Sequence, residues 1–241
     1  MKILNKKNII ISAHCDDALL SLGGYIIFLD NVIVVDIFGT CAWTKNTKIK
    51  DFNIITEINQ AEEKEAIKKS GAKVIIYALP EALMRGYRLW NQKKILESDA
   101  IISHKISKII TAVIGSNNNI FFPMGIGNHV DHILINNQLK KIYNKLNAKD
   151  NKIFLYEDLP YAWYGDVNKK IRVLKKAWIL EPYLIDISRS INKKINLIKI
   201  YKSQIDKIDC QKVVEYSESI IKGEKIERIW EVKRKNEKKF N

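Results

Sequence analysis

The stretch NIIISAHCDD, residues 8–17, runs from a β-branched segment into a polar cluster, and a helical pattern follows over residues 18–30. An uninterrupted apolar run of this length predicts a strand buried on both faces, as in a parallel α/β sheet. The same order recurs at residues 119–132, where NIFFP precedes GNHVDH and a helical stretch over about 129–146. Such strand-to-helix junctions are where parallel α/β sheets present functional side chains to a common crevice.

Strand and helix patterns alternate along most of the chain. This alternation predicts a Rossmann-like three-layer α/β/α sandwich with a mostly parallel sheet. No linker or repeat divides residues 1–241, so we expect one domain, with a basic tail at about 231–241. The further expected strands are 31–38, 72–79, 120–122 and 152–156, and the further expected helices are 51–69, 98–114 and 191–221.

The two polar clusters hold three of the four histidines of the chain. His14 and Asp17 are three residues apart, so an imidazole and a carboxylate at one turn can meet at one ion, which leaves Asp16 free to take a proton from water. One of His129 and His132 can complete a two-His, one-carboxylate site while the other faces the substrate. Alone, an Asp pair after a strand is more often a helix cap. The coincidence of both clusters favours a metal hydrolase.

The pattern Ala-His-x-Asp-Asp with a later His-x-Asp-His resembles the PIG-L or LmbE-like N-deacetylases. These are zinc-dependent enzymes that remove acetyl groups from N-acetylglucosamine conjugates. Four further segments resemble one branch of this family, so that the resemblance spans most of the chain. They are residues 83–85 (LMR), 123–129 (PMGIGNH), 156–161 (YEDLPY) and 201–204 (YKSQ).

The resemblance implies roles by position. His129 would stabilise the oxyanion and protonate the leaving amine, and Asp131 would orient a neighbouring histidine. Zinc is the implied metal, although a two-His, one-carboxylate site also accepts Fe²⁺. The implied metal ligands are His14, Asp17 and His132, and the implied general base is Asp16.

Three positions depart from the family pattern. Cys15 replaces a common proline, and we expect its thiol to face the backbone and be inert. Asn59 replaces a substrate-contacting arginine of relatives, for which Arg85 or Arg88 would substitute, and Glu81 stands where an aspartate is expected. The expected substrate-binding residues are Trp43, Arg85, Arg88 and Glu157. Loops 39–50, 80–90 and 158–167 carry aromatic residues suited to sugar rings.

Composition limits the other classes of function. The chain has 241 residues, 46% of them hydrophobic, and contains no apolar run long enough to span a bilayer. Its N-terminus does not resemble a signal peptide, and its three scattered cysteines predict no disulfide framework, so we expect a cytoplasmic protein. The net charge of +14 comes from lysines that are spread along the chain, a pattern that does not favour nucleic-acid binding. The positive charge favours an anionic sugar conjugate as substrate, because it attracts such a molecule by electrostatic steering. A homo-oligomer is left open.

The sequence therefore predicts a metal-dependent N-deacetylase acting on an N-acetylated amino sugar within a larger conjugate. One alternative is an amidase with the same site and a larger acyl group, which would need room near Trp43 and Arg85. The other is a basic nucleic-acid-binding module, but this function does not explain the two His/Asp clusters.

Overall fold

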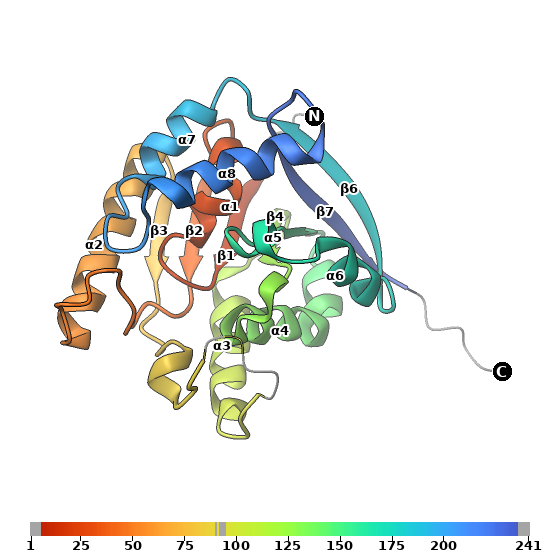
Figure 1. Cartoon of the computed structure of the whole chain (residues 1–241). Coiled ribbons are helices and arrows are strands. Elements are labelled where there is room, and N and C mark those ends of the chain that lie inside the picture. Colours follow the sequence, from red (N-terminus) through yellow and green to blue (C-terminus); the bar gives the residue numbers. More distant parts are fainter. Residues whose placement is uncertain (1–5, 90, 92–94, 236–241) are drawn as a thin grey trace.

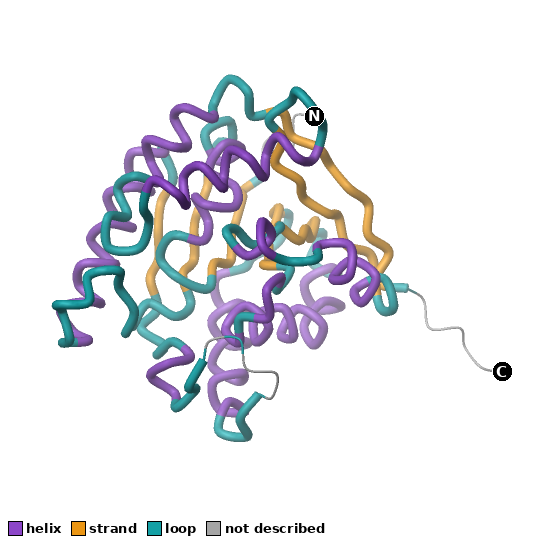
Figure 2. The backbone as a smooth tube through the Cα atoms, viewed as in Figure 1, coloured by secondary structure: helices purple, strands orange, loops and turns teal. Residues whose placement is uncertain are grey.

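The computed structural model describes residues 6–89, 91 and 95–235. Within these residues, strands form one mixed sheet in the order β3-β2-β1-β4-β5-β7-β6, with helices on both sides (Figure 2). The first five strands are parallel, whereas β7 runs antiparallel to both of its neighbours. The strands are β1 (Lys7–Ser12), β2 (Val32–Asp36), β3 (Lys73–Ile76), β4 (Asn118–Pro123), β5 (Lys152–Tyr156), β6 (Trp178–Asp186) and β7 (Ile226–Arg234).

Helices cover both faces of the sheet, as predicted for a three-layer sandwich. One face carries α1 (Asp17–Ile26), α2 (Phe52–Ser70) and α7 (Ile191–Ile198), and the other carries α3 (Asp99–Val113) and α4 (Val130–Asn147) (Figure 1). The remaining helices are α5 (Tyr161–Tyr164), α6 (Val167–Leu174), α8 (Lys207–Ile220) and the 3₁₀ turns η1 (Ala82–Arg85) and η2 (Ile126–Asn128). None of the described helices combines the length and apolar character needed to cross a bilayer.

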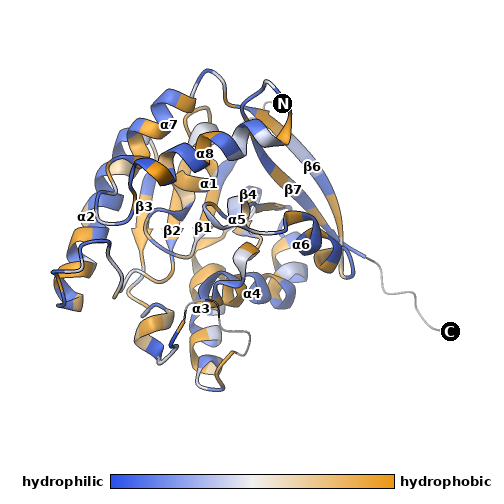
Figure 3. Cartoon of the chain, viewed as in Figure 1, coloured by the Kyte–Doolittle hydropathy of each residue, from blue (hydrophilic) through white to orange (hydrophobic). Residues whose placement is uncertain are grey.

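Strand β1 shows why its sequence is uniformly apolar. Ile9 and Ile11 belong to the core beneath α3 and α4, while Ile10 belongs to the core beneath α1 and α2. Successive side chains of a strand point to opposite faces, so a strand covered on both sides needs apolar residues throughout. Figure 3 accordingly shows hydrophobic colouring along the central strands and mixed colouring on the helices.

The sheet places the two polar clusters side by side. β1 pairs in parallel with β2 on one side and with β4 on the other, in the register Ile9↔Ile120. The direction of winding therefore reverses between β1 and β4, and ligands of open α/β sheets bind at the carboxyl ends of the strands at such a point. The loops after both strands, residues 13–17 and 124–129, open onto this edge.

The C-terminal part of the chain differs from the sequence prediction in three ways. Residues 191–221 form two helices, because the segment 199–206 turns toward α2, where Tyr201 is buried and donates a hydrogen bond to Glu63. The antiparallel pair β6–β7 was not predicted. Residues 231–234 of the expected basic tail belong to β7, whereas residues 236–241 of that tail, and Trp90, lie outside the described residues.

Candidate active site

The loop after β1 is held in an unusual backbone conformation. Asp16 has φ 127° and ψ −35°, a region that non-glycine residues adopt rarely and at a cost of about 1–3 kcal/mol. The Asp17 carboxylate accepts the His14 backbone N–H at 2.9 Å, and the Ser12 hydroxyl donates to the His14 carbonyl at 2.8 Å. These contacts support the strained turn, which directs His14, Asp16 and Asp17 toward one cavity.

The loop after β4 presents the second cluster at the start of α4. His129 is the N-cap of this helix, and its Nδ1 accepts the Asp131 backbone N–H at 3.2 Å. His132 lies one turn later and is fully buried. Two positive φ values, 77° at Gly127 and 63° at Asn128, turn the chain sharply enough to bring both rings back over β1.

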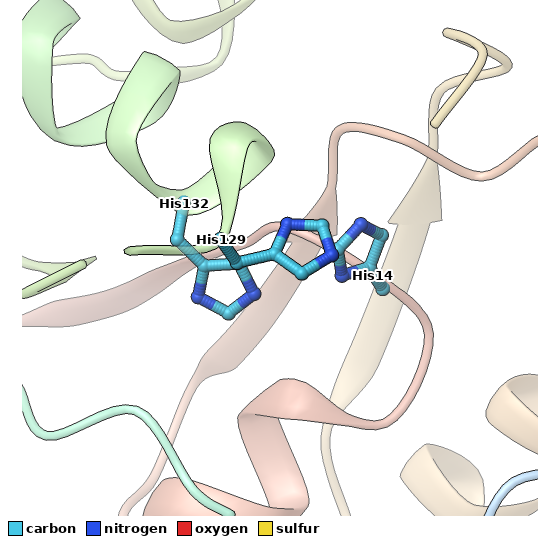
Figure 4. A group of neighbouring side chains, drawn as sticks. All are labelled: His14, His129 and His132. Carbon is cyan, nitrogen blue, oxygen red and sulfur yellow. The ribbon is translucent and has the colours of Figure 1, made fainter. Parts of the chain in front are cut away.

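The three imidazoles of the two clusters meet although their elements are far apart in sequence (Figure 4). Ring centroids are 4.7 Å apart for His14 and His129, 5.1 Å for His129 and His132, and 5.4 Å for His14 and His132. One nitrogen of each ring lies within 4.8 Å of the corresponding nitrogens of the other two. The fourth histidine, His104, is exposed on α3, away from this cluster.

Asp17 lies between two of these rings. Its Oδ2 is 3.3 Å from His14 Nδ1 and 3.2 Å from His132 Nε2. Two ligand atoms of a tetrahedral zinc lie roughly 3.3 Å apart, given zinc–ligand distances of about 2.0–2.2 Å. His132 Nε2 is buried, and its contact with Asp17 lacks the alignment of a hydrogen bond, so a cation between the two groups would satisfy both. These donors therefore fit a divalent metal ion.

Carboxylates behind the rings orient the histidines. Asp131 Oδ2 is 2.9 Å from His14 Nε2, and Asp158 Oδ1 is 2.7 Å from His132 Nδ1. Such contacts are the usual support of a metal-binding histidine, because they fix the tautomer and leave the other nitrogen free. Asp131 was predicted to orient a histidine, whereas Asp158 was missed: it stands in the quoted segment 156–161, but only its approach to His132 reveals its part.

The charges of the site depend on burial and on close neighbours. Burial opposes a positive charge on His132, but the carboxylates of Asp17 and Asp158 outweigh it and raise the pKa of His132 to about 9. Burial, together with the other two rings, holds the pKa of His129 well below its usual value. Burial and the adjacent Asp17 raise the pKa of Asp16. The histidine between carboxylates thus holds a proton that a cation would displace.

A cavity of about 310 Å³ lies in front of these groups. Loops 39–50, 80–90 and 158–167 all contribute to its wall, as predicted. Trp43 also lines it, as expected for a substrate-binding residue, while its own side chain remains partly exposed. The described lining residues with polar, thiol or aromatic side chains are His14, Cys15, Asp16, Asp17, Cys41, Trp43, Lys45, Asn59, Glu81, His129, Tyr161, Gln204 and Asp209.

Comparison with known proteins finds that the chain is similar to deacetylases. No family model matches the chain. A curated 2'-N-acetylparomamine deacetylase of Streptomyces fradiae is 24% identical over 209 residues, which are 83% of this chain and 74% of that protein. Among solved structures, the zinc-inhibited form of a teicoplanin deacetylase has a TM-score of 0.76 at 18% identity, over 96% of this chain and all of the other. The N,N'-diacetylchitobiose deacetylase of Pyrococcus horikoshii has a TM-score of 0.57 at 18% identity, over 95% and 84%.

The chain has the fold of the PIG-L/LmbE-like N-deacetylases. The fold that the resemblance to this family implied is therefore confirmed.

Two residues expected to bind substrate in this PIG-L/LmbE-like fold lie elsewhere. Arg85 is buried behind the site, where its guanidinium pairs with Asp99 and Asp131. Glu157 is also buried and accepts hydrogen bonds from Arg228 and Trp230 Nε1 at 2.6 and 2.9 Å. Both residues pair with other side chains and do not line the cavity. Spacing along the sequence does not predict such pairing.

The remaining substrate candidate, Arg88, is exposed and does not line the cavity either. Cys15 was expected to face the backbone. It is buried, but it forms part of the cavity wall together with Cys41. Asn59 and Glu81, the other two departures from the family pattern, do line the cavity, and Glu81 Oε1 accepts the Ala42 backbone N–H at 2.6 Å.

Proposed function

We propose that this chain is a metal-dependent N-deacetylase that hydrolyses the acetamide of an N-acetylated amino sugar within a larger conjugate. The products are acetate and the free amine. One observation carries the proposal: Asp17 lies between His14 and His132 at ligand-like distances, with Asp16 beside them in an open cavity. The deacetylase relatives, including one that acts on an acetylated paromamine, support the same reaction.

In this proposal His14, Asp17 and His132 hold the metal, with zinc favoured and Fe²⁺ also compatible. The bound metal would supply Lewis acidity toward the acetyl carbonyl and lower the pKa of water. The carboxylate of Asp16 lies in the cavity next to Asp17, where it takes the proton of the attacking water. A raised pKa suits Asp16 to return this proton later in the reaction.

His129 acts on the developing oxyanion. Its Nδ1 accepts the backbone N–H of Asp131, so the proton of the neutral ring sits on Nε2. A neutral ring is favoured because burial lowers the pKa of His129. A donor on Nε2 stabilises the negative oxygen formed when water adds to the carbonyl. The C–N bond then breaks, and the proton taken up by Asp16 passes to the leaving amine, so this proton transfer is assigned to Asp16 rather than to His129.

The cavity bears on the substrate. About 310 Å³ is at the lower end of small-molecule sites, which suits one acylated sugar ring with the rest of the conjugate outside. The four carboxylates of the described wall, Asp16, Asp17, Glu81 and Asp209, outnumber by one the three positive charges of Lys45 and a divalent metal. Locally this favours a neutral or cationic ring, in contrast to the anionic conjugate that the net charge of +14 favours.

The test is acetate release from a panel of neutral, anionic and cationic N-acetylglucosamine conjugates by zinc-loaded protein. Asp16→Asn should retain zinc and lose at least about 100-fold in kcat, the range of a general base. His104→Asn is the matched control, because His104 is exposed on α3 and should leave activity and zinc content unchanged. Near-normal turnover by zinc-loaded Asp16→Asn would refute the mechanism. Release of a bulky acyl group but not acetate would favour the amidase alternative.

A further inference from the structure

A buried ion-pair chain connects helix α3 to the ring of His14. Asp99, at the start of α3, is 2.8 Å from Arg85 Nε, and Arg85 Nη1 is 2.8 Å from Asp131 Oδ1. The other oxygen of Asp131, Oδ2, is 2.9 Å from His14 Nε2. The side chains of Asp99, Arg85 and Asp131 are at most 6% exposed. The chain therefore lies behind the metal-binding groups, out of reach of a substrate in the cavity.

Arg85 is itself fixed from several sides. Its Nη1 donates to the Pro80 carbonyl at 2.7 Å, and its Nη2 is 3.4 Å from the second oxygen of Asp99. The Tyr87 hydroxyl donates to Asp99 at 2.6 Å, and the guanidinium carbon lies 4.9 Å from the centre of the Phe38 ring. A planar guanidinium held in this way can present one nitrogen to Asp131 in a single orientation.

Asp131 depends on this support. It is fully buried, and an isolated buried carboxylate is costly unless it is paired. Its Oδ2 accepts the Ala82 backbone N–H at 3.0 Å as well as facing His14, so that Arg85 is the cation nearest to Oδ1 in the described chain. The Arg85 contact is an ion pair without the alignment of a hydrogen bond.

We propose that Arg85 is a positioning residue, which orients Asp131 and through it the metal-binding ring of His14. With Asp131 in place, His14 Nε2 carries the proton and Nδ1 faces Asp17. Arg85 thus acts on metal affinity and on catalysis without touching the substrate. This inference rests on the proposed metal site, but it does not depend on which acyl group is removed.

The test compares Arg85→Met and Arg85→Lys with the parent protein. Zinc affinity is measured without substrate, by competition with a chromophoric chelator. Loss of an outer partner of a metal ligand lowers metal affinity about 10- to 100-fold, and this loss is expected for Arg85→Met. Arg85→Lys keeps the charge but lacks the fork that reaches Asp99 and Asp131 together, so a smaller loss is expected. On zinc-saturated protein, kcat should fall while KM stays within about twofold of the parent value.

The control is Arg189→Met, because Arg189 is exposed in the loop between β6 and α7 and should change none of these values. Circular dichroism shows which Arg85 variants fold. If a folded variant binds zinc as tightly as the parent, the proposal is overturned. A raised KM with parental zinc affinity would instead indicate that Arg85 binds the substrate. A parent that binds zinc but releases no acetate refutes the proposed reaction and leaves the Arg85 result standing. A parent that binds no zinc overturns both.

Discussion

Asp158 shows how much of the site is settled by single contacts. It is fully buried, and its two oxygens face different partners: Oδ1 lies 2.7 Å from His132 Nδ1, and Oδ2 accepts the Ile126 backbone N–H at 2.9 Å. One carboxylate thus fixes both a ring and the turn that precedes α4. The sequence predicted the side chains that meet in the cavity and the orienting role of Asp131, but it did not predict that Asp158 supports His132.

Replacing Asp158 by Asn should therefore weaken the metal site. The amide can still accept from His132 Nδ1, but it lacks the negative charge that strengthens His132 as a ligand, so zinc affinity should fall about 10- to 100-fold. Chelator competition measures this fall. Asp150→Asn is the matched control, because the side chain of Asp150 is 91% exposed. Equal zinc affinity in both variants would contradict the assignment of His132 as a ligand.

The 3₁₀ turn η2 depends on a close contact between Gly127 and helix α5. Gly127 has φ 77°, and a Cβ placed there would lie 2.7 Å from the Cβ of Tyr161. The turn can therefore close against α5 and present His129 only if this residue has no side chain.

Gly127→Ala should combine two costs, the left-handed backbone of about 1–2 kcal/mol and overpacking of about 1–3 kcal/mol. Deacetylase activity should fall further than stability alone explains, because Tyr161 and His129 must move apart. Gly223→Ala is the comparison: its φ is 86°, but nothing lies within 4 Å of the added Cβ. Urea unfolding and turnover of both variants separate the two effects. Equal losses in both variants would show that close packing at Gly127 is unimportant.

The layers of the whole molecule are joined by buried charges. Lys194 on α7 and Glu227 on β7 are nearly inaccessible and 2.7 Å apart, and Glu227 also accepts the backbone N–H groups of Gly24 and Tyr25 in α1. The glycines of α1 make room for this contact, since a Cβ on Gly23 would lie 3.0 Å from the Lys194 side chain.

Lys194→Met should lower the free energy of unfolding by about 3–5 kcal/mol, because it leaves Glu227 charged and buried without its cation. The matched control is Lys225→Met, whose partner Glu218 is about half exposed. That surface pair should contribute no more than about 1 kcal/mol. Urea unfolding measures both changes, and a Lys194→Met variant as stable as Lys225→Met would refute this account.

A second buried group links α2 to the segment after α7. Burial raises the pKa of the Glu63 carboxyl to about 7, although the Tyr201 hydroxyl, which donates to Glu63 Oε2 at 2.5 Å, opposes the shift. Below pH 4.5, the ordinary pKa, the folded and unfolded forms are both protonated. Between pH 4.5 and about 7 only the folded form keeps the proton, so stability is lost as the pH rises through this window.

Glu63→Gln imitates the neutral carboxyl and should remove this loss. In the presence of chelator, the variant should gain stability relative to the parent between pH 5 and 7.5, by at most about 3 kcal/mol. Thermal unfolding at both pH values measures the difference. Parallel pH dependences of parent and variant would show that Glu63 does not carry a raised pKa.

Most of the α/β part was predictable because its signals are local. Strand β5 was predicted at its observed bounds, and α3 to within one residue at each end, since both depend on apolar pattern. The pair β6–β7 was not, because in β6 much of the nine-residue strand is exposed or partly exposed, and its pattern depends on its place at the sheet edge. The break between α7 and α8 was missed for a similar reason: contacts of Tyr201 and Ser203 with α2 override helical spacing.

By itself, the sequence determined the parallel sandwich and the meeting of the two His/Asp clusters. Strands covered on both faces need unbroken apolar runs, and parallel strands must open their functional loops at one edge. Only the tertiary structure decided that Asp158 holds the ring of His132, that Asp131 holds the ring of His14, that Arg85 lies behind them and that Glu157 is buried away from the cavity. A buried charge must find its partner in space, and no spacing along the chain records that distance.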